Sequence, residues 1–119
     1  MGKLATDAFI DGGLDAIDGC TRLTVQPSEP ASIANITANL LASVVIDGAD
    51  FTKANGDVSG RKLTVAQQAA ISITASGTAT HVVVDDGVDF YVTTCTSQAL
   101  TSGGTVTVPA WDIEIADPV

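Results

Sequence analysis

The single histidine is the side chain whose chemistry can be tested most directly against its neighbours. His81 lies in a β-branched run, Thr80–Asp85, and the sequence places no serine or cysteine nucleophile beside it. A catalytic base needs such a partner within hydrogen-bond reach, whereas a lone histidine in a strand is typical of packing or hydrogen bonding. The sequence also lacks the phosphate-binding glycine loops and the pattern His-Glu-x-x-His. We therefore expect neither enzymatic activity nor a cofactor.

Aspartate residues gather in two segments, Asp47–Asp57 and Asp85–Asp89. Calcium requires about six to eight oxygen ligands, and neither segment has the ligand order of an EF-hand loop. Aspartate also favours tight turns, so we expect solvated turn residues in both segments. A weak metal site shared between subunits is the alternative, and we expect no metal site within one chain.

The two cysteines, Cys20 and Cys95, are not expected to bind zinc, because a zinc site needs a full set of close ligands and the chain has one histidine. They are either small buried thiols or the ends of a disulfide, within one chain or between chains. Strand alternation places Cys20 on the face of its strand opposite to Leu23, and Cys95 on the face of its strand opposite to Phe90. Both thiols then fall on the less apolar faces of their strands, and burial and cross-linking both stay open.

The candidate contact residues are a basic pair and two aromatic side chains. Arg61-Lys62 is the only adjacent basic pair of an acidic chain, and it opens a predicted strand. It indicates either a docking contact for an acidic partner or the protection of a strand edge. Phe51 lies in a predicted loop, and Trp111, beside Pro109, is expected in the core or as an interface anchor. A carbohydrate-binding platform needs several rings exposed together, which these scarce aromatic residues do not favour.

These residues must be positioned by a short helix followed by many strands. Thr6 is a good N-cap for a helix whose apolar residues recur at helical spacing before Gly19. The segment Ala31–Leu40 is ambiguous and suits one or two helical turns, with Ser28 as the cap. The segment Asp47–Arg61 is expected to be a loop.

Short runs rich in Thr, Val and Ile predict strands, because these residues suit a pleated and half-buried surface. Asp86-Gly87, between two such runs, predicts a type I′ hairpin. The regular spacing predicts a mainly β fold, a small antiparallel β-sandwich or barrel with a short N-terminal α-helix, in which strand exceeds helix by about twofold or more. Residues 1–119 are expected to form one domain. The predicted strands are Thr21–Gln26, Leu41–Asp47, Lys62–Ala66, Ala70–Ala75, Thr80–Asp85, Val88–Thr94, Thr105–Val108 and Trp111–Ala116.

Alternation within these elements also predicts the core. Apolar residues on the inward side of each strand and of the helix are expected to be mostly buried. They are Phe9, Leu14, Ile17, Leu23, Val25, Ile46, Leu63, Val65, Ile71, Ile73, Val82, Val84, Phe90, Val92, Val106, Val108, Ile113 and Ile115.

Composition favours assembly over direct binding to nucleic acid or membrane. Charged residues make up 16% of the chain, against about 25% in typical soluble domains, and such a surface is easily desolvated by neighbours. The net charge is −9, which disfavours DNA, RNA and anionic lipid, because these are bound through Lys and Arg. No secretion signal opens the sequence, and the run Leu40–Ile46 is too short to span a membrane. We expect an oligomer made in the cytoplasm.

Several stretches together resemble a family of small virion proteins of tailed bacteriophages. They are the opening Ala8–Leu14 followed by Arg22-Leu23, the segment Gly60–Val65, the segment Gly77–His81 leading to Asp86-Gly87, and the ending Ala110–Ile115. The resemblance spans most of the chain, but it consists of turns and strand patterns rather than catalytic motifs. The chain departs from the family pattern in Phe51–Asp57 and in its two cysteines.

Within that family, the resemblance implies a capsid decoration, or cement, protein that binds the major capsid protein in many copies on the outside of the virion. A neck or tail component is the first alternative, and a host-surface or carbohydrate-binding module is the second. A cement protein needs a rigid scaffold and a surface that buries well against the shell. We expect the contact in the N-terminal segment or in Asp47–Arg61, because loops on a rigid scaffold usually carry the binding residues.

Overall fold

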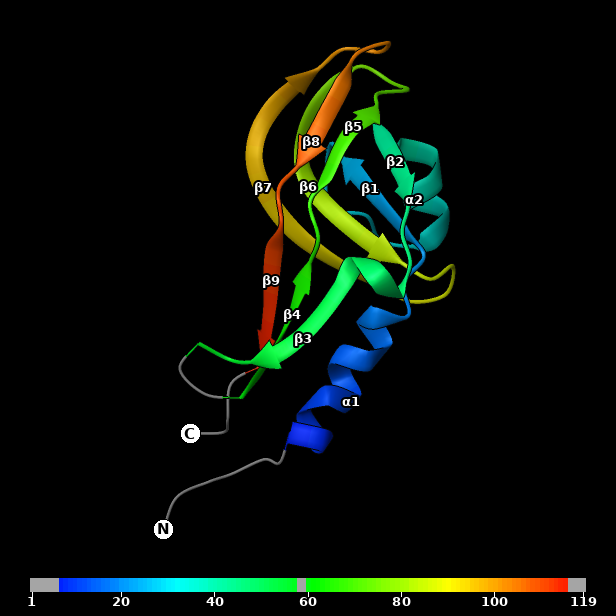
Figure 1. Cartoon of the computed structure of the whole chain (residues 1–119). Helices are drawn as coiled ribbons and strands as arrows, with labels where there is room; N and C mark the ends of the chain where they lie inside the picture. The colour runs from blue at the N-terminus through cyan, green and yellow to red at the C-terminus, as the bar shows by residue number, and fades with distance from the viewer. Residues whose placement is uncertain (1–6, 58–59, 116–119) are drawn as a thin grey trace.

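The computed structural model describes residues 7–57 and 60–115, without the side chains of residues 7–10 and 13. Strands contain 53% of the residues and helices 17%, which confirms the predicted antiparallel, mainly β class with an N-terminal helix. In chain order (Figure 1) the elements are α1 (Asp7–Asp18), β1 (Arg22–Gln26), α2 (Ile33–Asn39), β2 (Ala42–Val45), the 3-10 turn η1 (Gly48–Asp50), β3 (Phe51–Asn55), β4 (Arg61–Val65), β5 (Gln68–Ser72), β6 (Gly77–Asp85), β7 (Phe90–Leu100), β8 (Thr105–Val108) and β9 (Trp111–Ile115).

The strands form a four-stranded sheet, a three-stranded sheet (β3-β4-β9) and a two-stranded sheet (β5-β8). The two smaller sheets follow one another and together form a ribbon that packs against the four-stranded sheet (Figure 1). The four-stranded sheet has the order β2-β1-β6-β7. In the ribbon, β4 leads into β5, β4 pairs with β9, β5 pairs with β8, and β3 adds to the side of β4. Pairing along the ribbon is interrupted at Pro109, which has no N–H to donate. A bridge from Ala42 to Ile73 joins β2 to β5 on one side, whereas β7 on the other side pairs with β6 alone.

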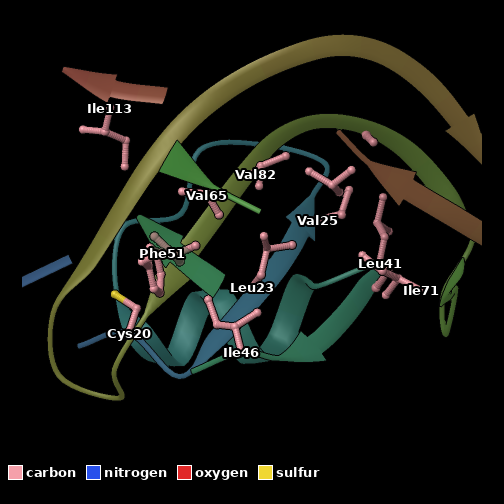
Figure 2. Close-up of a cluster of buried hydrophobic side chains, with 14 of the residues drawn as sticks. Cys20, Leu23, Val25, Leu41, Ile46, Phe51, Val65, Ile71, Val82 and Ile113 are labelled. Carbon is pink, nitrogen blue, oxygen red and sulfur yellow. The ribbon is translucent and has the colours of Figure 1, made fainter. Parts of the chain in front are cut away.

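The second half of β6 is covered on both faces. Successive side chains of a strand point to opposite faces, yet the run from Val82 to Asp85 is buried throughout. Val82 packs with Leu23 in the core between the sheet and the ribbon (Figure 2), and Val84 belongs to the same cluster. The side chain of Val83 must therefore be covered from the opposite side of the sheet.

A second helix helps to cover that opposite side. The sequence left the region of α2 ambiguous and predicted Ser28 as its cap, but the N-cap is Ser32, whose side chain accepts a hydrogen bond from the backbone N–H of Asn35. Ile36 is fully buried. Gln26 on β1 is also buried, and its Nε2 donates to the Ile36 carbonyl at 3.1 Å. A polar contact to the sheet thus holds α2 in place.

The segment predicted as a loop, Asp47–Arg61, contains a strand. Asp47 caps η1 by accepting from the backbone N–H of Ala49, and the carboxylate of Asp50 accepts from the backbone N–H of Asp47. The chain then enters β3, which pairs with β4 along its whole length. This correction matters for function, because β3 is part of the ribbon and not a free loop.

The predicted hairpin is present, but its turn is longer than predicted. Four residues, Asp86–Asp89, connect β6 to β7, and of the two central residues of the predicted turn only Gly87 has a positive φ, 92°. The backbone N–H groups of Asp89 and Val88 donate to the Asp86 carboxylate at 2.7 and 2.8 Å. These bonds hold the pKa of Asp86 below its usual value.

Most of the predicted core is confirmed. Ile17, Val92 and Val106 are half-buried, and the side chain of Phe9 lies outside the described part of the chain. The predicted core residues that are buried are Leu14, Leu23, Val25, Ile46, Leu63, Val65, Ile71, Ile73, Val82, Val84, Val108 and Ile113.

The predictions that Phe90 and Ile115 are buried are wrong, since Phe90 is 36% and Ile115 38% exposed. Phe90 pairs with Asp85 and Val92 pairs with Val83, so both point away from the core. Tyr91, one residue along, packs against the core instead. The apolar alternation of β7 therefore faces the other side of the sheet.

This register predicts unequal costs for two truncations. Leu23→Ala, at a fully buried position, should lower the free energy of unfolding by ~2–5 kcal/mol. Phe90→Ala should cost less than ~1 kcal/mol, because the ring keeps much of its contact with water. Urea unfolding of both variants measures the difference, and equal losses would contradict the register.

A second prediction concerns backbone strain at the bulge of β5. Ala70 has a φ of 54°, a left-handed conformation that costs about 1–2 kcal/mol for a residue with a Cβ. We expect Ala70→Gly to raise the unfolding free energy by up to about 1 kcal/mol. The neighbour Ala69 is also exposed and is the matched control, where Ala69→Gly should lower it by roughly 0.5–1 kcal/mol. Thermal unfolding measures both changes. If the two variants change the unfolding free energy in the same direction, Ala70 is not strained.

Candidate interaction surface

The outer face of the four-stranded sheet is the face turned away from the core, and α2 packs on part of it. Residues paired across antiparallel strands point to the same side, so the register defines which side chains lie there. One row is Val45, Arg22, Asp85 and Phe90, and the next is Ser43, Thr24, Val83 and Val92.

An ion pair lies in the middle of the first row. Asp85 is 2% exposed, and its carboxylate accepts from Arg22 Nε at 2.9 Å and from the backbone N–H of Gly87 at 3.1 Å. The guanidinium also donates to the hydroxyl of Thr37 on α2, at 3.3 Å. The pair thus connects β1, β6, the hairpin turn and α2, and its two charges cancel.

Apolar side chains stand at both ends of this row. Val45 on β2 is 84% exposed, and Phe90 on β7 is 36% exposed. α2 carries no charged residue and exposes Ala34 and Ala38 toward solvent. A single exposed valine is ordinary, but several exposed apolar side chains on one face without net charge are typical of a surface that a partner covers.

Long parts of the sequence near this face carry no charge. No Asp, Glu, Lys or Arg occurs in residues 30–46, 63–84 or 90–111, which supply α2, β2, β5, β7, β8 and most of β6. Many of the charged residues lie on α1, β3, β4 and β9. Figure 1 shows α1 and β3 at one end of the molecule and β5 and β8 at the other. Total charge and composition missed this segregation, which the positions of the charges in the sequence would have revealed.

The two aromatic candidates have places in or beside the core. Phe51 is 7% exposed and packs in the core (Figure 2), which corrects its prediction as an interface residue. Trp111 is half-buried against the core, where its ring stacks on Tyr91 with 6.0 Å between centroids. Its indole Nε1 is buried and has no hydrogen-bond partner among the described residues.

The basic pair is engaged within the chain. Arg61 Nε lies 2.9 Å from Asp11 of α1, and Lys62 Nζ lies 2.7 Å from Asp57 and 3.9 Å from Asp112 of β9. The hydrogen bond and charge of Asp57 raise the pKa of Lys62. Both basic residues therefore stabilise the ribbon, and their predicted role as a docking contact stays a prediction.

Both cysteines are free thiols. Cys20 is 4% exposed, which corrects its expected place on a less apolar face, and burial and nearby Asp86 raise its pKa to about 11. Cys95 is exposed on β7, where desolvation raises the pKa of its thiol. The two thiols line different cavities, Cys20 one beside Tyr91 and Cys95 one beside Val108. A disulfide within the chain is not formed.

The remaining titratable candidates act in turns. Asp47 and Asp50 cap η1, and Asp86 orders the hairpin turn, which confirms the predicted turn role of these three aspartates. The prediction that Asp85 is a solvated turn residue is wrong, since it is 2% exposed and belongs to β6. His81 Nδ1 lies 2.8 Å from the hydroxyl of Thr80. Within residues 7–57 and 60–115, no group of three or more His, Cys, Asp and Glu side chains is placed to hold a metal ion.

A groove runs along the free side of β7. Two adjoining cavities of about 260 and 400 Å³ lie between β7 and the strands β8 and β9. The residues common to both are Val82, Cys95, Thr96, Val108 and Pro109. These shared residues are uncharged, although Asp112 also lines the larger cavity. The lining brings no acid, base and nucleophile together, so the groove suits contact with a backbone or an apolar side chain.

The ion pair of the outer face gives a stability prediction. Arg22→Met leaves the Asp85 carboxylate buried without a countercharge, and we expect a loss of about 3–5 kcal/mol of unfolding free energy. Lys62→Met removes a more exposed pair and is the matched control, with an expected loss below ~1 kcal/mol. Denaturant unfolding of both variants is the measurement. Similar losses would show that Asp85 does not depend on Arg22.

In the described part of the chain, no helix is long and apolar enough to cross a membrane. No protein-family model matches the chain, and no curated protein or solved structure matches it either.

Proposed function

We propose that the protein decorates and stabilises the capsid of a tailed bacteriophage by binding shell subunits in many copies through its outer face. The family resemblance of the sequence suggests this class of protein. The observation that carries the choice of surface is the exposure of Val45 and Phe90 at the two ends of a row whose central charges, Arg22 and Asp85, neutralise each other.

Burying such a face against another protein costs little free energy. Fully burying an exposed apolar side chain contributes about 1.5–3 kcal/mol, which Val45 at 84% exposure approaches and Phe90 at 36% gives only in part. Arg22 and Asp85 already pair with one another, so a partner that covers them need not supply a countercharge. The strands and α2 are ordered before binding, which lowers the entropic cost of association. Modest contacts of this kind stabilise a shell when they are repeated over many sites.

The acidic residues fit the same role. Asp11, Asp15 and Asp18 lie on α1, and Asp15 pairs with Lys53 of β3. The net charge of −9 repels nucleic acid. A protein that binds a shell during genome packaging benefits from this repulsion, because it does not compete for the DNA.

The test compares two exposed valines on particles that lack the protein. Val45 lies on the outer face, and Val88, which is 78% exposed, lies in the hairpin turn and is the matched control. We expect Val45→Gln to weaken binding to the particles by about tenfold or more, because it places an amide where apolar contact is lost. Val88→Gln should bind as the unaltered protein does. Particle-bound protein is measured by sedimentation across a concentration series.

The function itself is tested by removing the protein from the virion. Particles without it should assemble and join tails, but should break at a lower temperature or under milder osmotic shock. Adding the purified protein should restore their resistance. If heads without it fail to join tails, the neck or tail alternative replaces decoration. If Val45→Gln and Val88→Gln bind equally well, the contact lies elsewhere than on the outer face.

A further inference from the structure

The outer edge of β7 contains a bulge but lacks the short length, charge and proline that keep other strand edges apart. β7 has eleven residues and pairs only with β6 among the described strands. Native edge strands are protected by short length, charge or proline, but Phe90–Leu100 contains no charged residue and no proline. Among the other edge strands, β3 carries Lys53 and β9 carries Asp112 and Glu114. β2, β5 and β8 are short, with four, five and four residues, and β2 is also bridged to β5.

The exposure of β7 points in the same direction. The six residues from Thr94 to Ala99 are all exposed, although the strand alternates between two faces. Three of them, residues 95–97, stand opposite Thr80 alone, which forms a bulge that bends the strand (Figure 1). The outer edge of this stretch is therefore open in the single chain, and its residues stay exposed even where Cys95 and Thr96 line the groove toward β8 and β9.

We infer that this edge is where a second copy of the chain docks, by antiparallel pairing of β7 with β7. The absence of charge on this edge favours a second copy of the chain over a basic partner. A copy carries the same net charge of −9, so it approaches with least repulsion where charge is absent, and residues 90–111 are uncharged. A basic partner would instead be attracted to the aspartates of α1. An uncharged strand of matching length is available in the chain itself.

The geometry of the pair is fixed by full overlap. When two antiparallel copies of residues 90–100 overlap completely, Phe90 of one lies opposite Leu100 of the other, and Cys95 lies opposite Cys95. Because the bulge disturbs the middle of the strand, the backbone hydrogen bonds form between the flanking segments Phe90–Val92 and Gln98–Leu100. The four-stranded sheets of the two copies then join into one continuous eight-stranded sheet.

This inference goes beyond the proposed function, because it concerns the isolated protein and does not depend on a capsid. The first test is oxidation of the Cys20→Ser variant with diamide at alkaline pH, where the Cys95 thiol is ionised. Two Cys95 thiols would lose two protons and two electrons to diamide and form one disulfide between chains. We expect a dimer on a non-reducing gel, formed at protein concentrations where sedimentation shows self-association, and none in Cys95→Ser.

The second test weakens the pair without oxidation. Thr94 is exposed on β7, and Thr52 is exposed on the other edge strand, β3. Thr94→Lys should raise the dimer dissociation constant by about tenfold or more, because Thr94 lies opposite Thr96 of the other copy and the two lysines are then diagonal neighbours of like charge on one face of the pair. Thr52→Lys changes the net charge equally and should leave the constant unchanged. Sedimentation equilibrium measures both, and circular dichroism confirms that both variants fold.

Three outcomes overturn the inference. The first is a protein that remains a monomer at high concentration, and the second is an oligomer that fails to cross-link through Cys95. The third is a Thr94→Lys dimer that dissociates no more readily than the Thr52→Lys dimer. Because these measurements use isolated protein, their failure leaves the particle experiments with Val45 unaffected.

Discussion

The burial of Asp85 is the constraint on which the outer face depends. A carboxylate that is 2% exposed must be compensated, and Arg22 supplies the charge from the neighbouring strand at 2.9 Å. Because the same guanidinium bonds Thr37 and the same carboxylate accepts from Gly87, one pair orients α2 and the hairpin turn together. The start of β7 is thereby fixed, and with it the direction in which Phe90 points.

The strands were largely predictable because their signals are local. Runs of Thr, Val and Ile ended by turn residues mark them in the sequence, and eight of the predicted strands overlap observed ones. β3 was missed because Phe51–Asn55 has no clear alternation and becomes a strand through pairing with β4. The position of Ser32 as the α2 cap, in place of Ser28, likewise depends on where the helix meets Gln26.

The candidate site was less predictable than the fold, and the reason is again physical. Alternation in β7 shows that Phe90 and Val92 share a face, but which face is buried depends on the rest of the sheet. The same limit applies to Cys20, whose burial comes from packing at the end of α1 and beside Tyr91. The basic pair was visible in the sequence, yet its partner Asp11 is fifty residues away from Arg61.

The outer face and the edge of β7 are separate surfaces that can be used together. A two-fold axis that pairs two antiparallel edge strands runs perpendicular to their common sheet. Rotation about such an axis leaves each face of the sheet on its original side, so both copies present α2, Val45 and Phe90 in the same direction. Under the proposed function, a shell that bound one copy would meet the second at high effective concentration. Pairing at β7 would thus strengthen attachment through the outer face without adding any contact to the shell.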